Sequence, residues 1–88
     1  MKETYYEVVA VAADGNTIPI GIKEINHKME LTIGATEYYT TNFVRGEGLF
    51  HHIATFFPIF KHLRLLEVVR DKEDSTNISY KILKEISL

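Results

Sequence analysis

The chain has 88 residues, 45% of them hydrophobic and 25% charged, with a net charge of −2. This composition is typical of a folded globular protein, and the length suits one domain, so we predict a single domain over residues 1–88. The absence of cysteine excludes disulfides and cysteine-based zinc sites. The N-terminus lacks a signal-peptide pattern and no stretch is long enough to cross a membrane, so we expect a cytoplasmic protein without membrane contact.

The first half of the chain has the patterns of β-strands. In residues 4–13 most side chains are apolar at both the odd-numbered and the even-numbered positions, which face opposite sides of a strand. This pattern predicts a central strand covered on both faces. Residues 18–22 alternate and contain Pro19, which favours an edge strand or a proline at the unpaired start of a strand. Residues 29–33 alternate cleanly between apolar and polar, and residues 37–44 are rich in β-branched and aromatic side chains. We therefore predict four strands before residue 45.

One amphipathic helix is predicted after these strands. Apolar residues recur there at helical spacing: Leu49, Ile53, Phe56, Phe60 and Leu63. We expect Gly46 and Gly48 to turn the chain into this helix, in preference to forming a phosphate-binding loop, because the other glycines of such loops are missing. Pro58 predicts that the regular helix ends near Phe57.

Two further strands are expected at the C-terminal end, over residues 63–70 and 78–86. In the second of these, Ile78, Ile82 and Ile86 are also four residues apart, so a helix is the rival interpretation. The predicted fold class is α+β: a single, mostly antiparallel sheet of five or six strands, in the order β-β-β-β-α-β-β, packed on one helix. One helix leaves part of such a sheet uncovered, and an uncovered sheet is a natural place for a partner or a second copy of the chain.

We expect no catalytic residues, no metal and no cofactor. His51 and His52 are neighbours on the predicted helix and point about 100° apart, so they do not converge on one ion. Glu47 could pair with His51 one turn away, which we interpret as an ion pair or a weak two-ligand site. The loop over residues 71–77 is acidic but lacks the spacing of a calcium loop. No serine lies in a nucleophile motif, so we favour a non-catalytic protein over an enzyme.

Our first functional hypothesis is a small regulatory module, of the accessory or inhibitor kind, that binds another protein or a second copy of itself as a homodimer. Residues 1–44 carry six acidic residues against three Lys or Arg. We expect the contact surface to include two acids and two adjacent tyrosines: Glu30, Glu37, Tyr38 and Tyr39.

Two alternatives remain open. The first is a small-ligand-binding protein or small enzyme, with a pocket between helix and sheet lined by Phe50, His52 and Phe56. The second is a weak nucleic-acid-binding domain that uses the cations of the second half: Lys61, Arg64, Arg70, Lys81 and Lys84. These cations alternate with acidic residues, which favours a solvated surface, so we do not expect nucleic acid as the partner.

Overall fold

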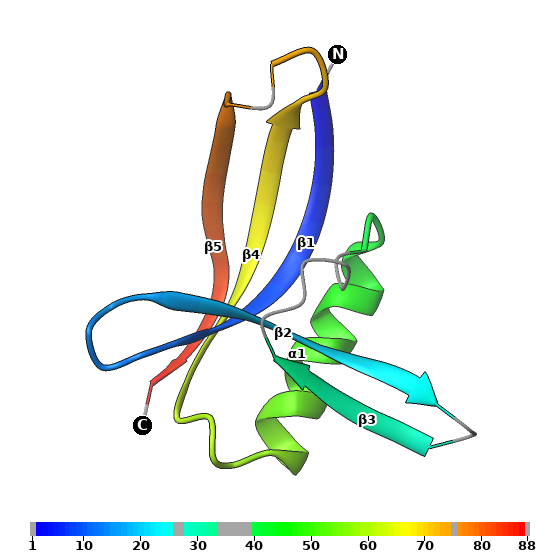
Figure 1. The fold of residues 1–88 in the computed structure, drawn as a ribbon, viewed down its shortest axis with the longest axis vertical. Helices are drawn as coiled ribbons and strands as arrows, with labels where there is room; N and C mark the ends of the chain where they lie inside the picture. Colours follow the sequence, from blue (N-terminus) through cyan, green and yellow to red (C-terminus); the bar gives the residue numbers. More distant parts are fainter. Residues whose placement is uncertain (1, 26–27, 34–39, 75, 88) are drawn as a thin grey trace.

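The computed structural model describes residues 2–25, 28–33, 40–74 and 76–87. Within these ranges it describes all side chains except those of residues 22–32. These described residues form one helix and five strands: β1 (Lys2–Val11), β2 (Thr17–Ile25), β3 (Lys28–Ile33), α1 (Phe43–Phe56), β4 (His62–Asp71) and β5 (Ile78–Ser87). The strands form one antiparallel sheet in the order β3-β2-β1-β4-β5. Figure 1 shows α1 against one side of this sheet, with β2 and β3 turned steeply away from the direction of β4 and β5. The predicted α+β class, with an antiparallel sheet and one helix, is confirmed.

The strand predictions hold for β1 to β5, with small changes in their bounds. β1 is the central strand, as its apolar composition indicates, but the prediction that both of its faces are covered is wrong, because α1 covers one face and the other lines an open groove. Pro19 pairs with Val9 of β1, whereas the described pairs between β2 and β3 begin at Ile20. The proline thus lies where β2 has no described partner on the β3 side, which fits its missing N–H. The C-terminal segment is a strand, so the rival helix is excluded there.

The beginning of the helix differs from the prediction. Residues 43–44 and both Gly46 and Gly48 lie inside α1, so a strand ending at residue 44 and a glycine bend before the helix are both wrong. Asn42 explains the early start, because its side-chain oxygen accepts a hydrogen bond from the Arg45 N–H at 3.2 Å. Thr40 forms an isolated bridge with Tyr6 of β1, while residues 37–39 of the predicted strand lie outside the described residues.

The end of the helix agrees with the prediction. Phe56 is the last helical residue, and the Phe57 N–H donates to the Ile53 carbonyl oxygen at 3.0 Å before Pro58 leaves the helix. Phe56 itself is 66% exposed and does not belong to the buried face that its spacing predicts. Phe57, the first residue after the helix, is partly buried and packs against the main core instead.

The main core lies between α1 and one face of the sheet. Its fully or almost fully buried side chains are Val8, Ile20, Phe50, Ile53, Leu63 and Leu65. Gly46 lets the helix approach β1 closely, since a Cβ at this position would lie 3.0 Å from the Tyr6 Cβ. The core therefore fixes α1 to one face of β1 and β4 and leaves the alternate residues of both strands on the opposite face.

Candidate functional site

The face of the sheet opposite α1 carries an open groove. A cavity of about 790 Å³ is lined there by Tyr5, Glu7, Val9, Thr17, Pro19, Arg64, Leu66, Arg70, Tyr80 and Ile82. These residues belong to β1, β2, β4 and β5, and on β1 and β4 they are the alternates of the residues that pack against α1. We call this surface the open-face groove. Its volume lies within the range of small-molecule sites, and it is also large enough for a few protein side chains.

The floor of the groove is apolar. A second buried cluster consists of Val9, Leu66 and Val68, with Tyr5 and Ile78 packed against it. Tyr80 and Ile82 on β5 are 62% and 48% exposed, so large apolar surface remains open beside this cluster. A second small core on an uncovered sheet face is typical of a surface that contacts a ligand or partner.

Glu7 is the unusual residue of the groove. It lies on the central strand, directly across from Leu66 of β4 and two residues from Val9. Its side chain is half-buried, and no described residue donates a hydrogen bond to it or forms an ion pair with it. Burial in these apolar surroundings raises the pKa of the Glu7 carboxyl above its usual value. The groove therefore contains a carboxylate that the fold itself does not neutralise.

The two arginines of the groove, by contrast, already have acidic partners. Arg70 lies 3.1 Å from the carboxylate of Glu3, and its guanidinium carbon lies 6.0 Å from the centre of the Tyr5 ring. Burial, followed by the nearby charge of Glu7, raises the pKa of the Tyr5 hydroxyl. The Arg70 guanidinium therefore has its ion-pair partner, Glu3, and the Tyr5 ring beside it at one end of the groove.

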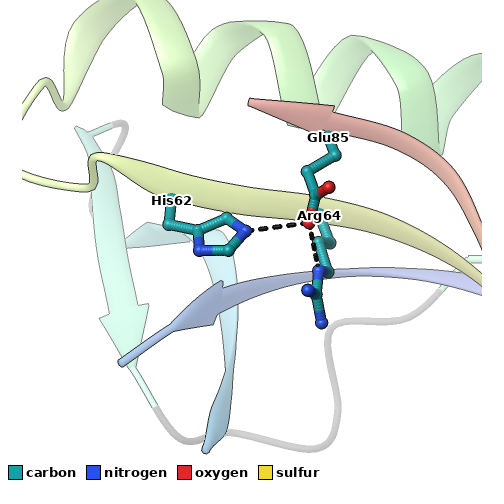
Figure 2. Close-up of polar contacts among 3 residues, drawn as sticks. All are labelled: His62, Arg64 and Glu85. Carbon is teal, nitrogen blue, oxygen red and sulfur yellow. Dashed lines mark hydrogen bonds and ion pairs between the residues drawn. The ribbon is translucent and has the colours of Figure 1, made fainter. Parts of the chain in front are cut away.

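Arg64 and His62 share one carboxylate at the other end. Figure 2 shows the Glu85 carboxylate between these two side chains, with the His62 Nε2 atom 2.8 Å from Glu85 Oε2 and the Arg64 Nε atom donating to the same oxygen. The hydrogen bonds from His62 and then from Arg64 hold the pKa of Glu85 below its usual value. The guanidinium of Arg64 is therefore already paired, although its side chain lines the groove.

The three residues of the predicted helix–sheet pocket do not line this groove. Phe50 is buried in the main core, whereas His52 and Phe56 are exposed and stack with a distance of 4.7 Å between ring centres. The cavity described above lies on the other side of the sheet.

The five cations of the nucleic-acid alternative are distributed over different parts of the surface. Arg64 and Arg70 lie on the groove side, each with an acidic partner. Lys84 reaches α1, where its Nζ atom lies 3.1 Å from Glu47 and 3.3 Å from His51 Nε2. Lys61 and Lys81 are exposed. The structure therefore does not gather these cations on one surface.

The surface predicted from Glu30, Glu37, Tyr38 and Tyr39 falls mostly outside the described part of the chain. Residues 37–39 lie outside the described residues, and Glu30 belongs to β3, where the structure describes the backbone alone. The proposed role of these four residues stays a prediction.

The other candidate ligands of the sequence make local structural contacts. Glu47 and His51 both contact Lys84 rather than each other. In the acidic loop, Asp71 accepts from the Glu73 N–H at 2.9 Å, and Asp74 accepts from the Thr76 N–H at 3.1 Å. These bonds close turns of the loop between β4 and β5. The pKa of the Asp74 carboxyl is lowered by the hydrogen bond that it accepts from the Thr76 hydroxyl, and then by the one from the Thr76 N–H.

The sequence predicts an uncovered part of the sheet but not the set of residues that lines this groove, although one signal for them was present. Tyr5, Glu7 and Val9 alternate on a strand that is otherwise apolar, and Glu7 is the single acid within residues 4–13. A charged residue inside a predicted central strand indicates either an edge or a functional surface.

Comparisons with known proteins identify no relative. No protein-family model, curated protein or solved structure shows a significant match to this chain. Within the described ranges, no helix has both the length and the apolar character needed to cross a bilayer.

Proposed function

We propose that the protein is a non-catalytic binding module and that the open-face groove is its contact surface for another protein. The observation that carries this proposal is a second apolar cluster, with Tyr80 and Ile82 exposed beside it, on the sheet face that α1 does not cover. Exposed aromatic and aliphatic side chains around a small buried cluster are typical of the centre of protein interfaces. The chain would act as a regulatory or accessory protein through this contact.

The test compares two charge substitutions at exposed isoleucines. Ile82→Glu places a carboxylate in the groove, whereas Ile59→Glu places one at a residue that is 78% exposed and does not line the groove. Both variants and the wild type are used as bait in extracts of the cells that produce the protein, and any retained protein is then purified and titrated by calorimetry. Circular dichroism confirms that both variants are folded.

The proposal predicts a partner that binds wild type and Ile59→Glu at one defined stoichiometry and loses at least about tenfold in affinity for Ile82→Glu, the factor that 1.4 kcal/mol represents. A purified partner whose affinity depends on Ile59 and not on Ile82 would refute the assignment of the groove.

A small-molecule ligand in the same groove is the second candidate, since a volume of about 790 Å³ suits such a ligand. Native mass spectrometry of the freshly purified protein separates the two candidates. Added mass from a retained small molecule that Ile82→Glu abolishes would favour the small ligand, whereas a bare chain that binds a purified protein would favour the module.

A further inference from the structure

The charges around the open-face groove do not balance. Three carboxylates (Glu3, Glu7 and Glu85) and two guanidiniums (Arg64 and Arg70) surround it. The two arginines are paired with Glu3 and Glu85, so the remaining charge belongs to Glu7, which no described residue neutralises. His62 lies against Glu85 and not against Glu7. A positive charge placed at Glu7 by an incoming group would therefore complement this groove.

The apolar part of the groove has a definite place relative to this carboxylate. Glu7, Leu66 and Ile82 form one row across β1, β4 and β5, since Glu7 pairs with Leu66 and Leu66 pairs with Ile82. Two strand spacings amount to about 10 Å. An extended arginine or lysine side chain covers most of this distance, and a hydrogen bond of about 3 Å from its charged end to the carboxylate covers the rest. A methylene stem can lie over Leu66 and Ile82 while its charged end meets Glu7.

Tyr80 adds an aromatic surface to the same site. It lies two residues from Ile82 on β5, lines the groove and is 62% exposed. Cations bind favourably over aromatic rings, and arginine does so more often than lysine. Tyr5 already has Arg70 near its ring, so Tyr80 is the tyrosine with the more exposed ring.

From these three observations we propose that the groove binds a basic side chain, arginine or lysine, of the partner protein, with its charge against the Glu7 carboxylate and its stem over Leu66 and Ile82. This inference rests on the proposed function and specifies the chemistry of the partner. It also accounts for a half-buried carboxylate that the fold leaves unpaired, because the partner would supply the missing charge.

The experiment uses small probes that imitate the side chain. The ¹⁵N-labelled protein is titrated by NMR with n-butylguanidinium, with its neutral analogue n-butylurea and with the anion pentanoate. The proposal predicts saturable shifts of the groove amides with n-butylguanidinium that exceed those with either analogue. It also predicts that this probe lowers the pKa of Glu7, followed by carboxyl ¹³C shifts, because a bound cation favours the ionised form.

Glu7→Gln and Glu67→Gln form the matched pair of variants. Gln keeps the shape and an acceptor oxygen but removes the charge, and Glu67 is adjacent to Leu66 on β4, where the side chains alternate to the other face. We expect Glu7→Gln to weaken n-butylguanidinium binding about tenfold, which corresponds to 1.4 kcal/mol, and Glu67→Gln to leave it unchanged.

Four results would overturn the inference. Equal binding of n-butylurea would show that charge is not recognised, and preferred binding of pentanoate would assign the site to the arginines. A dimer in sedimentation that Glu7→Gln dissociates would assign the groove to a second copy of the chain. If a partner protein is lost on Ile82→Glu but retained on Glu7→Gln, the inference fails while the proposed function stands.

Discussion

Replacing Glu7 by methionine should make the protein more stable, which is unusual for a substitution on a central strand. Methionine has a similar length, carries no charge and can pack against Val9 and Leu66. Full burial of such a side chain contributes about 1.5–3 kcal/mol, so a half-buried one contributes about 1 kcal/mol to the free energy of unfolding. For a chain of this size, this corresponds to a rise in Tm of about 4–8 °C.

The increase in the free energy of unfolding of Glu7→Met over the wild type should depend on pH, and the direction of this dependence follows from the pKa of Glu7. Burial raises the pKa of Glu7 in the folded state above the value of 4.5 for the free side chain. Ionisation of the Glu7 carboxyl is therefore less favourable in the folded state than in the unfolded state. As a result, the free energy of unfolding of the wild type falls as the pH rises from 4.5 through the folded-state pKa. The advantage of Glu7→Met should be larger at pH 7 than at pH 4, where the wild-type carboxyl is mostly protonated.

Urea unfolding followed by circular dichroism at both pH values measures this effect. At pH 7 the midpoint should rise by about 0.5–1 M urea, and Glu73→Met, at an exposed loop position, serves as the control with little change. A Glu7→Met protein that is no more stable than the wild type at pH 7, or whose advantage is the same at pH 4, would refute the description of Glu7 as an unpaired, desolvated carboxylate.

Two further predictions concern the helix and the far end of the groove. Gly46→Ala should lower stability, because its Cβ would lie 3.0 Å from the Tyr6 Cβ. Gly48→Ala, whose Cβ would have nothing within 4 Å, should raise stability by about 0.5–1 kcal/mol. Thermal unfolding of both variants tests this, and equal effects would contradict the close contact of α1 with β1. Carboxyl ¹³C titration should give a pKa for Glu85 below 4.5 that moves upward in both His62→Ala and Arg64→Ala, and a Glu85 that titrates like a free side chain would exclude the shared ion pair.

The sequence allowed the fold class, the helix end and the strands of the sheet to be predicted, because their signals are local. Alternation on the strands and Pro58 after the helix are of this kind. The helix start was missed, although its N-cap residue, Asn42, is also a local signal. Gly46 and Gly48 resemble a bend in isolation, whereas the reason for a glycine at position 46 is its close contact with Tyr6, forty residues earlier. That contact exists only in the folded chain.

The groove depends even more on tertiary structure. Its residues come from four strands, and their common face follows from the pairing of β1 with β2, of β1 with β4 and of β4 with β5. The separation of Phe50 from His52 and Phe56 follows from which side of α1 packs on the sheet, whereas the spacing alone allowed Phe56 to be buried. The lone acid at Glu7 was the available sequence signal for the groove.

Site-specific photocrosslinking tests the assignment of the contact surface most directly. A photoreactive phenylalanine analogue is introduced at Tyr80 in the groove or at Ile59 outside it, both of which are largely exposed. Illumination of the producing cells should yield a discrete adduct of this chain with another protein from position 80 and none from position 59. The same adduct from position 59 alone, with none from position 80, would contradict the proposal that this protein binds a partner through the open-face groove.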